Sequence, residues 1–270
     1  MRHRAIVTIL GCLAATVPAG GQIMSNPGQW YINNQIYSTR VFNGVVANSM
    51  LARSRGTTGR AGARGPATPA PEPTQFRESA STTIPAMLAA NSSGITRTPD
   101  EARRLFTSYI DLYKATARKD RFPANDLAYA FEYFVVNNWQ IYHDLVDVPY
   151  EKDPRARRAR DGFDRISVMA LKKTEQVTPF QERAIYEQFS ARLGASADIR
   201  AMTDAQKQEA TELMATLFGV NFAVYMKGVD ALDDATAQQG RDMARQGLEK
   251  LLGVPITRIH LTNRGIEIDP

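Results

Sequence analysis

The sequence has 270 residues but only one cysteine, Cys12. This cysteine lies within residues 1–19, which we expect to be removed from the mature chain. Without it, the mature chain has no disulfide, no thiol nucleophile and no thiolate ligand for a metal ion. Stability then has to come from packing alone, and the part of the chain after Arg97 is long enough to bury a core of its own.

Long apolar runs are also lacking, apart from a short one at the N-terminus. Arg2 and Arg4 precede an apolar run of 13 residues that ends at Val17, and small residues surround Ala19. A basic start, a short apolar stretch and a small residue at the cut are typical of a secretory signal peptide, whereas a membrane span needs about 20 apolar residues. We therefore predict a cleaved signal peptide over residues 1–19, no transmembrane span in the mature chain, and a periplasmic or secreted bacterial protein.

One alternative would give Cys12 a role. The residues from Ile9 to Cys12 loosely resemble the cleavage box of a bacterial lipoprotein, which is lipidated on its cysteine. The apolar run continues for five residues beyond Cys12 and only seven of its residues precede it. This placement favours ordinary cleavage over lipidation.

The motifs of common cofactor and metal enzymes are missing too. The sequence contains no Walker loop, no GxGxxG fingerprint, no nucleophile elbow and no HExxH pair, so we expect neither a cofactor nor a metal ion. Residues 1–97 carry a net charge of +7 and residues 98–270 a net charge of −2. Because nucleic-acid binders usually gather Lys and Arg on their folded part, we expect no nucleic-acid partner.

Composition divides the rest of the chain into three parts. Residues 20–50 mix aromatic and branched residues with Asn and Gly, and form a short segment that could be a strand, a helix or both. Residues 51–97 are rich in Gly, Pro, Ser, Thr and Arg, a composition that buries too little apolar surface to order itself, so we predict a disordered linker. The pattern turns helical at Thr98, and residues 98–270 are predicted to form one helical domain.

Apolar residues recur at helical spacing throughout this domain. Caps of the Thr-Pro or Thr-Asp type precede three of the expected helices. In order, the predicted helices begin at Thr98, cover about 125–147, run from Asp153 to Lys173, begin at Thr178, begin at Thr203, and cover 234–252.

Three details of this pattern set the expected architecture. The helix over 125–147 is apolar nearly all round, as expected of a central, buried helix. The helix after Asp153 has its apolar positions at Phe163, Ile166, Met169 and Ala170, and two glycines in the last helix, Gly240 and Gly247, allow close helix contact. Alternation around Asn263-Arg264-Gly265 predicts a hairpin. The fold class is therefore all-α: a five- to six-helix bundle with a small C-terminal β-hairpin, preceded by a disordered linker.

Four stretches carry a resemblance to a known family. They are FPANDLAYAFEYF from Phe122, TDAQKQEA from Thr203, RDMARQGLEKLLG from Arg241 and RIHLTNRGI from Arg258. The chain resembles a family of secreted bacterial helical proteins described as a domain of unknown function. The likeness covers most of residues 98–270, although residues 148–177 look longer or different here. The family has no characterised activity, so the resemblance implies no site residues.

His143 and Asp147 form one candidate site. At i,i+4 on the predicted second helix they share a face, and with further ligands they could hold a metal ion, or they could act together in hydrolysis. A histidine near a helix C-terminus also favours the negative end of the helix dipole and pairs with a surface acid. That ordinary interpretation is preferred, because a metal site needs three or four converging ligands.

Glu132 forms the other candidate site, because it interrupts the apolar run from Ala128 to Phe134. A buried carboxyl has a raised pKa and can act as a general acid. The ordinary alternative is a Glu on one solvated edge of the helix or paired with an Arg. Glu132 lies about 16 Å along the helix axis from His143, so the two residues cannot act together directly.

Other polar positions have mainly structural interpretations. Asn137 and Asn138 are expected to form helix–helix hydrogen bonds. The basic run from Arg155 to Arg160 could contact anionic lipid or a cell-wall polymer, but nearby acids favour a solvated helix face.

The sequence favours a non-enzymatic binding or interaction module of the periplasm or cell envelope. Its partner would be a protein or an envelope component, and the oligomeric state is not indicated. Whether the protein is an enzyme stays open, with no enzyme preferred. One alternative is a periplasmic hydrolase that uses Glu132 or the His143/Asp147 pair, and a second is a carrier of a small apolar ligand.

Overall fold

The structure is a computed structural model that describes residues 72–90, 96 and 98–269. The predicted signal peptide, Cys12, the segment over 20–50 and the first part of the predicted linker lie outside the described residues.

The helices begin where the sequence places capping side chains. Thr98 accepts a hydrogen bond from the backbone N–H of Glu101, and Thr178 and Thr203 each form a reciprocal capping box with a glutamine three residues later. The elements are α4 (Ile84–Ala90), α5 (Pro99–Asp120), α6 (Leu127–Tyr142), α7 (Pro154–Arg158), α8 (Gly162–Glu175), α9 (Pro179–Ala195), α10 (Ala197–Ala201), α11 (Asp204–Asp230), α12 (Asp234–Leu252), β1 (Ile259–Thr262) and β2 (Gly265–Ile268), with single 3-10 turns at Tyr150–Lys152 and Ile256–Arg258. The predicted all-α bundle with a C-terminal hairpin is confirmed.

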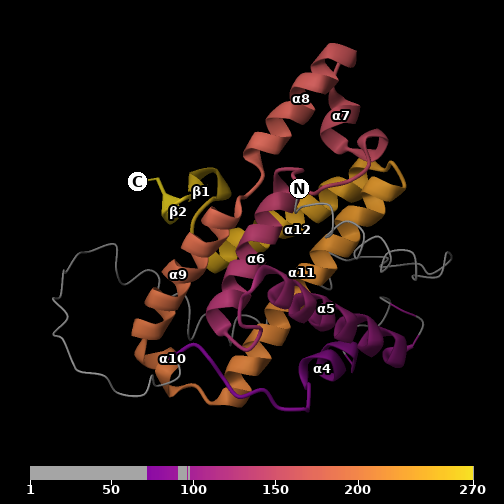
Figure 1. The fold of residues 1–270 in the computed structure, drawn as a ribbon. Helices are drawn as coiled ribbons and strands as arrows, with labels where there is room; N and C mark the ends of the chain where they lie inside the picture. The colour runs from indigo at the N-terminus through magenta and orange to yellow at the C-terminus, as the bar shows by residue number, and fades with distance from the viewer. Residues whose placement is uncertain (1–71, 91–95, 97, 270) are drawn as a thin grey trace.

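Helix α6 lies at the centre of the bundle, packed against α9, α11 and α12 (Figure 1). Most of its residues are buried, on every side of the helix, as its nearly continuous apolar sequence predicts. The predicted end near Asp147 is wrong. The helix ends at Tyr142 because Asp144 adopts a left-handed backbone conformation, with φ of 52°.

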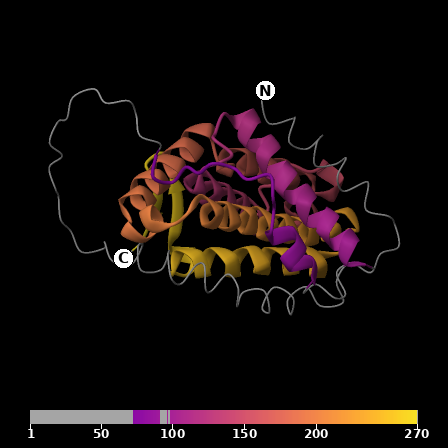
Figure 2. The same cartoon turned by 90° about the horizontal axis from the view of Figure 1, so that it is seen from below.

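Helices α11 and α12 run side by side below α6 (Figure 2). Glycines allow this approach: a Cβ atom on Gly240 would lie 2.6 Å from the backbone of Tyr225, and one on Gly228 would lie 2.1 Å from the backbone nitrogen of Ala237. The predicted close contact at Gly240 is therefore confirmed. Asn221 of α11 donates a hydrogen bond to Asn138 of α6, which is the helix–helix bond expected there.

The C-terminal hairpin packs on α9. Its two strands pair with Leu261 opposite Ile266 and a two-residue turn between them, as the alternation predicts. Gln188 of α9 accepts a hydrogen bond from the backbone N–H of Ile266 and donates one to its carbonyl. One helix side chain thus fixes the hairpin edge.

Residues 72–90 correct the predicted linker over 51–97. Phe76 is buried, its backbone exchanges hydrogen bonds with Asn125, and Lys207 donates a hydrogen bond to the carbonyl of Pro73. Helix α4 then packs on α5. The linker composition did not reveal this order because the partners lie in distant parts of the chain.

The helix predicted from Asp153 to Lys173 is divided into α7 and α8. Asp161 caps α8 by accepting hydrogen bonds from the backbone N–H groups of Phe163 and Asp164, so the chain turns just before it. The two helices project from the bundle (Figure 1), and we call residues 154–175 the arm. None of the described helices has the length and apolarity to cross a bilayer.

Candidate functional site

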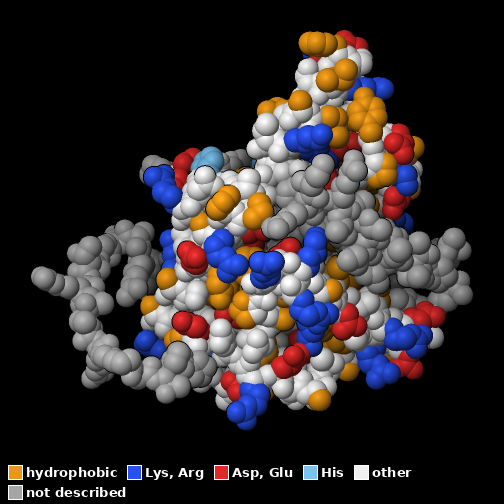
Figure 3. Space-filling model, viewed as in Figure 1, with side chains coloured by type: hydrophobic (Ala, Val, Ile, Leu, Met, Phe, Trp, Pro, Cys, Tyr) orange, Lys and Arg blue, Asp and Glu red, His pale blue; other side chains and the backbone are white. Residues whose placement is uncertain are grey.

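The arm exposes apolar side chains. Phe163 is 78% exposed, Ile166 68% and Leu171 54%, while the buried residue of α8 is a lysine, Lys172. Figure 3 shows hydrophobic side chains on the projecting part of the molecule. Large exposed apolar groups that gather on one element mark sites of interaction. The arm is therefore a candidate binding surface.

A buried ion pair holds the arm at its base. The ammonium of Lys172 lies 2.5 Å from the carboxylate of Asp153, and both side chains are almost fully buried. Lys172 also donates a hydrogen bond to the carbonyl of Val146 at 2.6 Å. Asp153 in turn caps α7, because its other oxygen accepts hydrogen bonds from the backbone N–H groups of Arg155 and Ala156. The pair thus connects both helices of the arm with the chain after α6.

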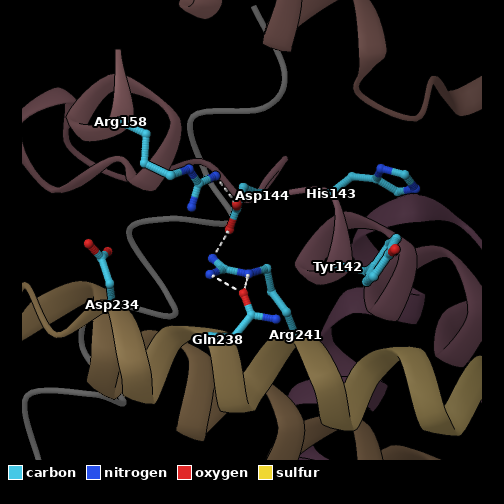
Figure 4. Close-up of a pocket in the computed structure, with 7 residues that line it drawn as sticks. All are labelled: Tyr142, His143, Asp144, Arg158, Asp234, Gln238 and Arg241. Atoms are coloured by element: carbon cyan, nitrogen blue, oxygen red, sulfur yellow. Dashed lines mark hydrogen bonds and ion pairs between the residues drawn. The ribbon is translucent and has the colours of Figure 1, made fainter. Parts of the chain in front are cut away.

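A polar pocket of about 590 Å³ lies between the arm and α12. Its centre is the buried carboxylate of Asp144, which binds Arg158 of α7 at 2.5 Å and Arg241 of α12 at 2.8 Å. Tyr225 of α11 donates a further hydrogen bond to Asp144. Figure 4 shows the residues that line the pocket: Tyr142, His143, Asp144, Arg158, Asp234, Gln238 and Arg241.

This network connects the arm with the bundle. One carboxylate engages guanidinium groups from α7 and α12, and Arg241 is held in place by Gln238, which accepts hydrogen bonds from its Nε and Nη2. Arg157 of the arm pairs with Asp234 at the start of α12. Such charge-assisted bonds have fixed geometry. The pocket therefore serves to orient the arm, and its charged lining does not suit an apolar ligand.

The structure does not bring His143 and Asp147 together. Because α6 ends at Tyr142, the i,i+4 relation expected for the pair is lost. The His143 ring lies against Trp139, 4.1 Å between centroids, and points away from Asp144 and Arg241 (Figure 4). Asp147 instead accepts a hydrogen bond from Gln176. Burial, and then the charge of Arg155, lower the pKa of His143. Within the described parts of the chain, no group of His, Cys, Asp and Glu could hold a metal ion.

Glu132 is buried, with 3% of its surface exposed, so it does not lie on a solvated edge. Burial raises its pKa well above the usual value, and repulsion from Glu182 of α9 and Asp120 of α5 adds to the rise, against attraction from Arg183. Burial and Asp120 likewise raise the pKa of Glu182 to about 7. Among the described residues, no Lys, Arg or His forms an ion pair with Glu132. A protonated carboxyl can donate a proton, but as a buried group it also makes stability depend on pH.

Replacing Glu132 with glutamine is expected to stabilise the protein above neutral pH. A carboxyl with a raised pKa keeps a proton in the folded state that the unfolded state releases as the pH rises. The stabilisation that the raised pKa of Glu132 provides is therefore fully present below pH 4.5, the ordinary pKa of a glutamate, and is lost as the pH rises. Glutamine mimics the neutral form at every pH. At pH 8 the variant should keep the free energy of unfolding that the wild type loses. This amounts to about 1.4 kcal/mol for each unit by which folding raises the pKa of Glu132.

Urea unfolding at pH 4 and pH 8 checks this expectation. Glu187→Gln is the matched control, because Glu187 lies on the exposed side of α9 and its replacement should change little at either pH. Equal stability of wild type and Glu132→Gln at pH 8 would show that Glu132 is ionised at no cost in the folded state.

The sequence pattern indicates Glu132, but it does not indicate the arm or the ion pairs that hold the arm in place. The apolar periodicity of Phe163 and Ile166 is the same as that of a core helix, so their exposure could not be read from it. The Asp161-Gly162 step, a helix cap, was the one local sign that a new helix starts there. Asp144 and Lys172 depend on partners 97 and 19 residues away in the sequence, which no local pattern shows.

A protein-family model matches most of the chain. The model of a family described as "Family of unknown function (DUF6683)" matches residues 1–158 and 166–269. The break between the two matched parts, residues 159–165, covers the turn after α7 and the first four residues of α8, including Phe163. It lies within the stretch 148–177 whose sequence looked different from the family. No curated protein and no solved structure matches the chain.

Proposed function

This chain belongs to DUF6683, a family of unknown function, and we propose that it is an exported, non-enzymatic binding module of the cell envelope. In this proposal the arm docks on an envelope component through Phe163 and Ile166. Export is supported by the basic, then apolar N-terminus of the sequence.

The exposure of the apolar face of α8 carries the proposal. Leaving a large apolar side chain in water forgoes about 1.5–3 kcal/mol compared with burying it, and α8 does this at two positions one turn apart. The ion pairs of Lys172 and Asp144 hold the arm in a fixed orientation. A pre-oriented surface binds with a smaller entropic cost than a mobile one.

The alternatives receive less support. A hydrolase based on His143 and Asp147 would need the two side chains to meet, and they have separate partners. One based on Glu132 would need a substrate to reach this carboxyl, which is 3% exposed and does not line the described pocket. A carrier would need an apolar chamber, whereas the described pocket is lined by charged groups.

Fractionation of cells that express variants tests the proposal. The wild-type chain is expected to be recovered with the washed envelope fraction. The double variant Phe163→Ser/Ile166→Ser should move largely to the soluble periplasmic extract, because it lacks the apolar contacts that bind the partner. The measurement is the ratio of soluble to envelope-bound protein on a quantitative blot.

Phe180→Ser is the matched control. Phe180 is 82% exposed, at least as much as Phe163, but lies at the start of α9, at the end of α8 remote from the tip. It should remain with the envelope like the wild type. A double variant in the arm that stays envelope-bound would overturn the docking role of α8.

A further inference from the structure

We infer that the arm docks on an anionic phospholipid bilayer, with Phe163 and Ile166 entering the lipid interface and the arm's cations facing the lipid phosphates. This inference rests on the proposed docking function and names the partner. Three features of the arm carry it: its charge, the placement of its unpaired cations, and the shape of its apolar surface.

The arm is the basic part of an acidic domain. Residues 154–175 contain seven Lys and Arg but three Asp and Glu, a net charge of +4. The other residues of 98–270 contain 17 Lys and Arg and 23 Asp and Glu, a net charge of −6. Three of the seven cations pair with acids outside the arm, Asp144, Asp153 and Asp234, so the arm together with these partners keeps a net charge of +1. An anionic surface therefore attracts the arm more than the rest of the domain, which orients the approaching molecule.

Three cations of the arm have no acidic partner among the described residues and are free to meet phosphates. Arg155, Arg157, Arg158 and Lys172 form ion pairs with acids of the arm or bundle. By contrast, the side chains of Arg160, Arg165 and Lys173 are exposed, and none of them pairs with any residue that the structure describes. Paired cations thus hold the arm in place. Of the unpaired ones, Arg160 lies in the turn before Phe163, Arg165 lies about 160° from Phe163 around α8, and Lys173 lies about 15 Å from it along the helix axis.

The apolar residues lie on the outer face of α8. At 100° per residue, Phe163, Ile166 and Ala170 fall within about 60° of one another and opposite the buried Lys172. Lys173 lies on the edge of the same face. A helix with apolar residues on one face and cations beside it is the arrangement that binds at a lipid–water interface, where buried apolar area and attraction to anionic lipid add together.

A bilayer fits this surface better than a folded protein does. A stable protein interface buries about 800 Å² on each side, with charged residues depleted at its core. The tip offers a narrow ridge of two large apolar side chains, with Arg160 before them and the acids Asp161 and Asp164 at the start of the same helix. A ridge of this kind can enter a fluid surface, which closes around it without needing a complementary shape.

Sedimentation with lipid vesicles tests the inference on the mature chain. The vesicles are phosphatidylcholine alone and phosphatidylcholine with 30 mol% phosphatidylglycerol. We expect partitioning onto the anionic vesicles at least tenfold above that onto neutral ones. Phe163→Ser/Ile166→Ser should lower the anionic partition coefficient roughly tenfold or more, and Arg160→Gln/Arg165→Gln/Lys173→Gln should lower it and weaken its dependence on salt.

Two controls keep the result interpretable. Phe180→Ser should bind as the wild type does, and circular dichroism should show that each variant keeps its helices. Anionic binding that survives both arm variants would place the lipid contact elsewhere, for example in the basic residues before Thr98, and overturn the inference. Absent vesicle binding together with arm-dependent retention in the envelope would also overturn it, in favour of a protein partner. If neither vesicle binding nor arm-dependent retention in the envelope were seen, the proposed docking function would be rejected as well.

Discussion

Lys172→Met is expected to release the arm from the bundle. The substitution keeps the length of the side chain but leaves the buried carboxylate of Asp153 without its partner. Breaking a buried ion pair on one side costs about 3–5 kcal/mol. Because α8 buries little besides Lys172, most of this cost should appear as local opening. Amide exchange in α8 should accelerate on the order of a hundredfold or more, while exchange in α11 changes much less.

Two further variants isolate the cause. Lys173→Met removes the neighbouring lysine, which is exposed, and should leave exchange in α8 close to that of the wild type. Adding Asp153→Asn to Lys172→Met should recover part of the loss, because asparagine removes the unpaired charge and still caps α7. If α8 exchanged at the same rate in Lys172→Met as in the wild type, the arm would be held by something other than this ion pair.

Gly240→Ala should destabilise the whole bundle. Alanine is about 1 kcal/mol better than glycine inside a helix, so an unhindered replacement would stabilise α12. At this position the new Cβ would lie 2.6 Å from the backbone of Tyr225, and the two helices must separate. Overpacking of a close contact costs about 1–3 kcal/mol, occasionally more. Since backbone cannot move aside as a flexible side chain can, we expect a net loss of at least about 2 kcal/mol in the free energy of unfolding.

Gly194→Ala provides the comparison for this result. Gly194 lies in the last turn of α9, and a Cβ there would meet Pro73 at 3.7 Å, an ordinary contact. Urea unfolding should show this variant to be as stable as the wild type or slightly more so. A Gly240→Ala protein that gains stability in the same assay would mean that α11 and α12 are not in close contact at Tyr225.

The parts of the fold that follow from local chemistry were predictable. Thr98, Thr178 and Thr203 mark helix starts through a hydrogen bond within four residues, and the start and end predicted for the last helix match α12. The end of α6 was not predictable in the same way. It is set at Asp144 by arginines from α7 and α12. The nearest helix-breaking residue in the sequence, Pro149, lies five residues further on and indicates a later end.

The candidate site residues also divide into those that local sequence predicts and those that depend on distant partners. Glu132 was identified because an acid within an apolar run is a local signal, and its burial follows from the position of α6. The binding surface was not identified, because Phe163 and Ile166 have the spacing of core residues. Whether such a face is buried depends on which elements pack on it, and here the chain folds so that none of the described ones covers it.

The envelope association of the Phe163→Ser/Ile166→Ser variant tests the central claim most directly, measured beside Phe180→Ser in the same preparation. The account predicts that the arm variant shifts to the soluble extract while the Phe180 variant sediments with the envelope as the wild type does. Equal distribution of the two variants, in either fraction, would contradict a docking role for the arm.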